Sequence, residues 1–283
     1  MASALFSHVP VVVRGGGDLA SGVIYRLRRA GFPVIVTELA APMLVRRTVS
    51  YGDAVYSGNI TVDGQTARLA VDYQDAAAVL AAGDIPVLVD PESRYWPEFQ
   101  PVALVDGRVA KVNLDTHITD APLVIGLGPG FTAGVDCHVV IETNRGHYLG
   151  RVIHQGSAML DTGEPGMVKG QTHSRVLRAA SNGHVRPVAH IGDSLEPGQV
   201  IASLNDTPIV APFPGVLRGL IHERVVVHAG MKIGDLDPRG DVEICYSISD
   251  KSLAVGGGVL EAILAAPQVR SVVEEAHETS SSL

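Results

Sequence analysis

The chain has 283 residues, of which 46% are hydrophobic and 18% charged, a composition typical of a folded globular protein long enough for two domains. Its net charge of −8, from 22 basic and 30 acidic side chains, argues against a nucleic-acid-binding surface as the main function. There is no apolar run of about 18 residues, and the N-terminus lacks the pattern of a signal peptide. We therefore expect a cytoplasmic protein that binds neither nucleic acid nor a membrane.

Cysteine and histidine usage predicts no metal site. Cys137 and Cys245 are the only cysteines, and they do not form a CxxC motif. The 11 histidines include no HExxH or HxH pair that would place two imidazoles on one face. A disulfide is not expected in the cytosol.

Residues 9–38 read as strand, glycine turn, helix and second strand, which is half of a nucleotide-binding fold. Gly15, Gly17 and Ala20 fit the GxGxxG/A pattern, with Gly16 between the two glycines. Glycines permit the tight turn and let backbone N–H groups approach a pyrophosphate, while a small third residue lets the helix pack near the strand. These residues are therefore candidates for cofactor binding.

Three charged residues flank this turn. Arg14 adds positive charge next to the glycines, and Glu38 ends the second strand at about the spacing, roughly 20 residues, at which dinucleotide folds place a carboxylate for ribose hydroxyls. Asp18 lies inside the motif. It either belongs to the site or caps the helix and repels an anion, in which case the turn is structural.

Two further features are expected to line the same crevice. Arg46 and Arg47 suit bidentate binding of a phosphate or carboxylate, with a solvated surface pair as the alternative. A second glycine turn, Gly126, Gly128 and Gly130, follows another apolar strand. Turns after parallel strands meet at the carboxyl edge of the sheet, so both glycine turns can face one ligand.

The remaining elements continue an α/β pattern. We expect a strand or hairpin over 60–69, a helix over 73–82, and strands over 86–90, 123–125 and 137–142. An Asp106-Gly107 pair predicts a hairpin within 102–112. Glu142 either binds a ligand or caps a turn, and the glycine run 256–258 is either a flexible turn or an anion-binding helix start.

Residues 183–238 have no helical period and contain short β-rich runs separated by glycine and proline turns. Aligning Gly198 with Gly230 superimposes two similar units, and the stretch resembles the biotinyl/lipoyl carrier fold, a barrel-sandwich. A carrier needs a lysine at the hairpin between its halves, where this chain has Asn205, Asp206 and Thr207. We therefore expect the fold without covalent biotin or lipoate.

The motifs in combination resemble the YqeB family of accessory proteins for selenium-dependent molybdenum hydroxylases. The resemblance covers nearly the whole chain and rests on RGGGDLASG, RRTVSYGDAVYSG, GLGPGFTAGVDCHVVIETNRGHYLGRVI and ISDKSLAVGGGVLEAIL. The first part is also similar to the Rossmann domain of XdhC-type maturation factors. These resemblances imply a role in maturing, inserting or modifying a molybdenum-cofactor enzyme, with that client hydroxylase as partner.

The sequence thus predicts a Rossmann-like parallel-sheet α/β domain at 1–170, a small all-β barrel-sandwich module at 171–250, and at 251–283 a helix returning to the first domain followed by a frayed tail. The expected ligand is a molybdenum pterin cofactor or a nucleotide. An NAD-dependent oxidoreductase and a non-catalytic scaffold are the alternatives. Whether any reaction is catalysed, and whether the chain forms a homo-oligomer, stay open.

Overall fold

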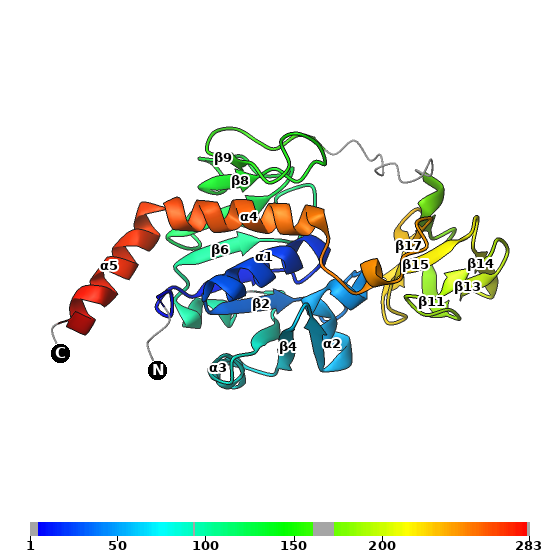
Figure 1. The fold of residues 1–283 in the computed structure, drawn as a ribbon, viewed down its shortest axis with the longest axis horizontal. Coiled ribbons are helices and arrows are strands. Elements are labelled where there is room, and N and C mark those ends of the chain that lie inside the picture. Colours follow the sequence, from blue (N-terminus) through cyan, green and yellow to red (C-terminus); the bar gives the residue numbers. More distant parts are fainter. Residues whose placement is uncertain (1–4, 93, 161–172, 282–283) are drawn as a thin grey trace.

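The structure is a computed structural model that describes residues 5–92, 94–160 and 173–281 (Figure 1). Its larger part is a nine-stranded sheet in the order β3-β4-β5-β2-β1-β6-β7-β8-β9. The strands are β1 Val11–Arg14, β2 Val34–Glu38, β3 Asn59–Val62, β4 Gln65–Ala70, β5 Ile85–Val89, β6 Ala103–Asp106, β7 Leu123–Leu127, β8 Val139–Ile141 and β9 Val152–Ile153.

Pairing in this sheet is parallel from β4 to β8, and only the outer pairs β3–β4 and β8–β9 are antiparallel. The central strands are fully buried because helices cover both faces. Those helices are α1 Asp18–Ala30, α2 Ala54–Ser57, α3 Tyr73–Ala81, α4 Asp250–Ala265 and α5 Pro267–Ser281.

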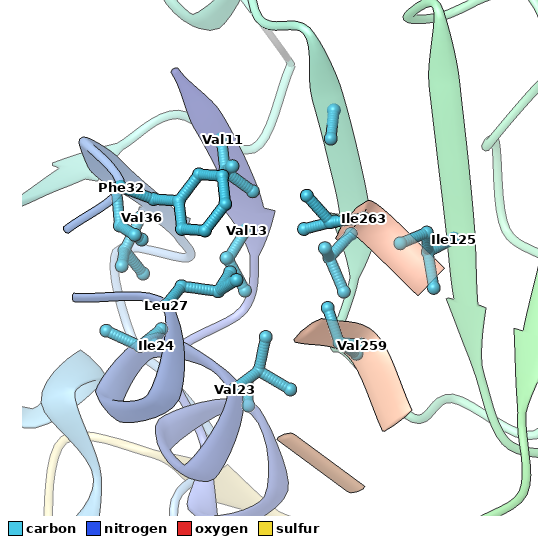
Figure 2. Packing of buried hydrophobic residues seen from close by; sticks show 14 of the residues in the cluster. Val11, Val13, Val23, Ile24, Leu27, Phe32, Val36, Ile125, Val259 and Ile263 are labelled. Atoms are coloured by element: carbon cyan, nitrogen blue, oxygen red, sulfur yellow. The ribbon is translucent and has the colours of Figure 1, made fainter. Parts of the chain in front are cut away.

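Helices α1 and α4 share one face of the sheet. Figure 2 shows Val23 and Leu27 of α1 beside Val13, and the same cluster takes in Val259 and Ile263 of α4. The opposite face carries a second cluster, in which Ala76 of α3 joins buried residues of the central strands. The result is three layers, helix, sheet and helix.

The glycine run 256–258 lies inside α4, so the turn or helix start expected there is wrong. A Cβ at Gly22 of α1 would stand 2.1 Å from the carbonyl oxygen of Ser252, and one at Gly256 would stand 2.3 Å from that of Gly22. The glycines therefore let the backbones of α1 and α4 touch.

The hairpin expected over 102–112 is also wrong. Strand β6 pairs in parallel with β1 on one side and β7 on the other. All four of its residues are buried, as in the central strands of parallel sheets, and Asp106-Gly107 ends the strand instead of turning it back.

The smaller part is all-β and has two four-stranded antiparallel sheets, β10-β17-β15-β12 and β14-β13-β11-β16. The strands are β10 Val176–Arg178, β11 Gly183–Pro187, β12 Ser194–Leu195, β13 Val200–Leu204, β14 Thr207–Val210, β15 Gly215–Leu220, β16 Val226–Val227 and β17 Lys232–Asp237. It has its own hydrophobic core, and we call it the β module. Figure 1 shows it beside the carboxyl edge of the large sheet.

The mixed α/β class predicted from the sequence is confirmed, with a parallel-containing sheet and additional antiparallel sheets. The hairpin between β13 and β14 turns at Asn205 and Asp206, whose φ angles are 49° and 63°. The expected boundary at 170/171 lies outside the described residues. Among those residues no single helix has the length and hydropathy of a membrane span, although α4 and Pro267–Glu275 meet that test as a pair bent by 62°.

Candidate functional site

The first glycine turn follows β1, and its polar backbone groups are largely used within the protein. The N–H of Gly15 donates to the carbonyl oxygen of Thr37 at 2.8 Å, and that of Gly16 donates to Oε1 of Glu38 at 2.7 Å. The carbonyl of Gly16 accepts from the N–H of Gly52 at 2.9 Å. A short 3₁₀ segment, Tyr51–Asp53, therefore lies directly on the turn.

Glu38 is buried beneath this contact, with 9% of its surface exposed. Its Oε2 accepts from the N–H of Leu39 at 2.9 Å, so each carboxylate oxygen already binds a backbone donor. Burial raises the pKa of Glu38, and the hydrogen bonds from Gly16 and Leu39 oppose that shift. The carboxylate organises the turn, and its oxygens are shielded from solvent.

Asp18 begins α1 but does not cap it, because the cap residue is Gly17 and no side chain bonds there. Its carboxylate instead accepts two bonds from Nη1 of Arg46, at 3.0 Å and 2.9 Å, and one from the hydroxyl of Ser252 at 2.9 Å. The capping role considered for Asp18 is thus wrong, and its negative charge is paired.

Arg46 and Arg47 connect the α/β part with the β module. Arg46 is 6% exposed, and its Nη2 donates to the carbonyl of Ile244 at 3.0 Å. The Nε of Arg47 donates to the carbonyl of Leu220 at 2.9 Å, and its Nη1 lies 3.4 Å from Asp53. The solvated surface pair considered for these arginines is therefore wrong; a role toward a ligand stays a prediction.

A charged cluster lies where the strand order reverses. From β1 the chain proceeds to β2 on one side and later to β6 on the other, so the carboxyl ends of β1 and β6 flank a topological switch point. In such sheets ligands bind in the crevice outside this point. The switch-point cluster consists of Arg14, Asp106, Arg108, Asp115 and Thr116.

Hydrogen bonds run through the whole cluster. Arg108 donates to both oxygens of Asp106, the shortest bond being 2.6 Å, and to Oδ1 of Asp115, also at 2.6 Å. Arg14 is 5% exposed and donates to Thr116 at 2.8 Å and to Asp115 at 3.0 Å. Asp106 is 1% exposed, whereas the side chain of Asp115 is 51% exposed. Arg14 is therefore a buried, hydrogen-bonded residue of this cluster and is not exposed to water.

The second glycine turn is packed against its own surroundings. A Cβ at Gly126 would lie 2.4 Å from the ring of Phe131, and one at Gly128 would lie 2.4 Å from the hydroxyl of Thr143. At Gly130, whose φ is +107°, a Cβ would stand 2.7 Å from the backbone of Val112. These glycines are explained by close packing, and their predicted ligand contacts stay predictions.

Glu142 follows β8 and is 2% exposed. Its oxygens accept the N–H groups of Asn144 at 2.7 Å and Met159 at 2.8 Å. Of the two roles left open for Glu142, the structure shows the turn cap.

Arg108, Asp106, Asp115 and Thr116 were not expected from the sequence. The signal was present, since an acidic residue ends an apolar strand and an arginine follows two positions later. It was hidden by the hairpin interpretation, which sends the chain back on itself and places Asp106 at a tip instead of the carboxyl edge.

The thiols have no reactive surroundings. Cys137 and Cys245 are both buried. Desolvation raises the pKa of Cys137 to about 11, and it also raises the pKa of Cys245. Within the described ranges, no three side chains of the His, Cys, Asp and Glu types are grouped to hold a metal ion.

Comparisons with known proteins give one sequence relative. No protein-family model matches the chain. The chain is 49% identical over 257 residues, 91% of its length, to the uncharacterized protein YqeB of Escherichia coli K12. It spans about half, 48%, of that curated relative. This similarity supports the resemblance to the YqeB family.

Two solved structures share low similarity. An aspartoacylase family protein from Mesorhizobium loti is 12% identical, with coverage of 81% of this chain and 84% of that one and a TM-score of 0.26. A succinylglutamate desuccinylase/aspartoacylase from Rhodobacter sphaeroides is 14% identical, with coverage of 82% and 86% and a TM-score of 0.25. Scores this low carry no conclusion about fold or activity.

Proposed function

We propose that this chain is an accessory protein for the maturation of a molybdenum hydroxylase and that it binds a phosphate-bearing ligand, a molybdenum pterin cofactor or a nucleotide, at the carboxyl edge of its large sheet. The role comes from the motif resemblance to the YqeB family, which the sequence similarity to YqeB supports. The β module is the surface for the client enzyme. In this role the chain holds and presents a ligand and needs no reaction of its own.

The strand order supports a nucleotide-type ligand. Strands β5-β2-β1-β6-β7-β8 run parallel in the order that doubly wound dinucleotide-binding sheets use, with the switch point at β1 and β6. We therefore propose a Rossmann-like sheet. For the β module we propose a barrel-sandwich that lacks the attachment lysine, because Asn205 and Asp206 occupy its central hairpin.

The placement of Asp115 is the observation that carries the ligand proposal. A carboxylate that is 51% exposed lies between two arginines at the switch point, 2.9 Å from Nη2 of Arg14 and 2.6 Å from Nη2 of Arg108. Although partial burial opposes the shift, hydrogen bonds from Arg108 and Arg14 lower the pKa of Asp115. An anionic ligand group that displaces this exposed carboxylate meets both guanidinium groups at once.

The NAD-dependent alternative is less favoured by the geometry. Ribose recognition needs a carboxylate at the end of β2 that the sugar hydroxyls can reach. Glu38 already binds the N–H groups of Gly16 and Leu39, and a Cβ at Gly52 would lie 2.8 Å from its Oε1. A ribose has to displace this segment before it reaches Glu38.

Mass spectrometry of small molecules released from the native protein tests the proposal. The parent should release a phosphate-bearing pterin or nucleotide, and Arg108→Gln should release about a tenth as much or less, because loss of a charge-assisted contact costs roughly 1.5–3 kcal/mol. Asp115→Asn should retain at least the parental amount. Arg68→Gln is the matched control. Arg68 lies in β4, which β5 and β2 separate from β1, and 52% of its side chain is exposed.

Release of NAD(H) would support the oxidoreductase instead. Equal release from the parent and Arg108→Gln, or none from the parent, would contradict a switch-point ligand.

A further inference from the structure

Within the described part of the chain, the contact between the two parts of the molecule contains more arginine and lysine side chains than carboxylates. These charged side chains lie on the sheet that contains β15 and β17, on the face opposite the core of the β module. Leu217 and Leu236 lie in that core. Arg218 and Asp237 follow them in sequence and therefore lie on the other face. This face meets the α/β part closely, since a Cβ at Gly219 would lie 2.7 Å from the carbonyl of Val45.

Each of three carboxylates at this contact has an arginine of its own. Asp18 is bound by Arg46 through two hydrogen bonds. Asp235 lies 3.3 Å from Nη2 of Arg175. Asp237 is bound through both oxygens by Arg239, at 2.9 Å and 2.7 Å.

Among the residues that the structure describes, two further cations, Arg218 and Lys232, have no carboxylate assigned to them alone. The guanidinium of Arg218 has a side-chain exposure of 14%, and its ion-pair distances to Asp235 and Asp237 are long, 3.6 Å and 3.9 Å. Among the described residues its Nε is buried without a hydrogen-bond partner, as are the Nε of neighbouring Arg46 and that of Arg28, which lies away from this contact. Buried polar groups normally have a partner, so the Nε groups of two neighbouring arginines can donate to an added acceptor here.

The electrostatic surroundings are consistent with this excess. Desolvation lowers the pKa of Arg218 and repulsion by Arg46 adds to the effect, while attraction to Asp235, Asp18 and Asp237 opposes it. Lys232 is exposed at its surface, yet the protein around it lowers its pKa by desolvation, with further repulsion from Arg175 and Arg218 opposed by Asp235 and Asp18. A bound anion would relieve the repulsion among these cations.

We infer that Arg218 and Lys232, with Arg46 beside them, form an oxyanion subsite between the β module and the first turn of α1, and that it takes a phosphate group. The subsite is separate from the switch-point cluster; it rests on the proposed function only for the identification of that phosphate as part of the ligand. Arginine and lysine are the side chains that phosphate recognition uses, and the free N–H groups of a helix start favour negative charge nearby.

Calorimetric titration with inorganic pyrophosphate tests the subsite. We expect Arg218→Gln and Lys232→Gln each to weaken binding about tenfold or more, and Arg218→Lys to recover part of it, because a lost charge-assisted hydrogen bond has that effect on affinity. Arg186→Gln, in the other sheet of the β module with a side-chain exposure of 76%, should bind within about twofold of the parent.

Folding of every variant is checked by thermal melts. If Arg218→Gln does not fold, the exposed Lys232→Gln decides the outcome. Competition by AMP would show that the phosphate of a nucleotide enters the subsite, and its absence would assign the subsite to a free oxyanion.

A parent that does not bind pyrophosphate, or Arg218 and Lys232 variants that bind it unchanged, would overturn the inference. The two proposals fail separately. Loss of pyrophosphate binding in Arg218→Gln but not in Arg108→Gln upholds the subsite even if no ligand is released from the native protein.

Discussion

The first glycine turn and the glycine run of α4 both allow close backbone contacts, but with different parts of the chain. The turn contacts a 3₁₀ segment, and the run contacts helix α1. At the turn, the backbones of Gly16 and Gly52 are in contact, and the N–H of Gly52 donates to the carbonyl oxygen of Gly16 at 2.9 Å. At the crossing of α1 and α4, Gly22 and Gly256 let two helices touch. A glycine run thus indicates close backbone approach, but its partner is decided by residues far away in the sequence.

Within the first turn the glycines also differ. A Cβ at Gly16 would stand 2.6 Å from the N of Gly52, whereas the nearest atom to a Cβ at Gly17 is a methyl group of Leu44 at 3.6 Å. Gly16 is therefore needed by the fold, and Gly17 has room. If a ligand approaches this turn, it does so at Gly17.

The largest effect is expected at the helix crossing. Gly22→Val should destabilise the protein by more than about 3 kcal/mol or prevent folding, because its Cβ would overlap the carbonyl oxygen of Ser252 at 2.1 Å. Gly257→Ala is the matched control. Gly257 lies in the same helix, α4, but nothing lies within 4 Å of a Cβ added there. There a gain of about 0.5–1 kcal/mol follows from helix propensity.

Urea denaturation monitored by circular dichroism measures both changes. A Gly22→Val protein as stable as the parent would show that α1 and α4 do not touch through their backbones.

The next effect separates the two glycines of the turn. Gly16→Ala should cost about 1–3 kcal/mol, because the segment Tyr51–Asp53 has to move away. Gly17→Ala should cost less than about 1 kcal/mol, since the residue has φ −71° and lies at the helix cap, where alanine is a weaker cap than glycine. Equal losses in the two variants, measured by thermal unfolding, would remove the distinction between a covered and an open glycine.

Local pattern was enough for the first strand, turn, helix and second strand. The buried run of valines gives β1. The apolar residues on the buried side of α1 continue to its end at Gly31, which adopts φ 97°, a left-handed cap. These features depend on neighbours in the sequence, so the sequence alone predicts them. The hairpin at Asn205 and Asp206, where both φ angles are positive, was expected from the resemblance to the carrier fold.

Side-chain partners far apart in the sequence could not be predicted in this way. Arg46 binds the carbonyl of Ile244, 198 positions away, and Arg14 binds Asp115, 101 positions away. The pairing of β6 between β1 and β7 is equally non-local, so a local turn signal at Asp106 gave the wrong topology. Where the candidate site is made of such contacts, only the fold brings it together.

The smallest effect concerns the carboxylate beneath the first turn and appears as a dependence on pH. Because burial raises the folded-state pKa of Glu38, the folded protein takes up this proton before the unfolded chain does as the pH falls. The contribution of Glu38 to stability is therefore greatest below its unfolded pKa of about 4.3 and declines as the pH rises through the folded value. Glu38→Gln has no such proton and keeps one amide oxygen for the N–H of Gly16.

Urea denaturation of the parent and Glu38→Gln between about pH 4 and about pH 8 measures the difference in unfolding free energy, in which all other titrating groups cancel. The parent's advantage over the variant should shrink as the pH rises, by about 1.4 kcal/mol for each unit by which the pKa of Glu38 is raised. A difference that stays constant over this range would mean that Glu38 is not desolvated beneath Gly16 and Gly52. The turn would then be open enough for a ribose to reach that carboxylate. Gly16 would no longer be a close backbone contact comparable with the crossing of α1 and α4.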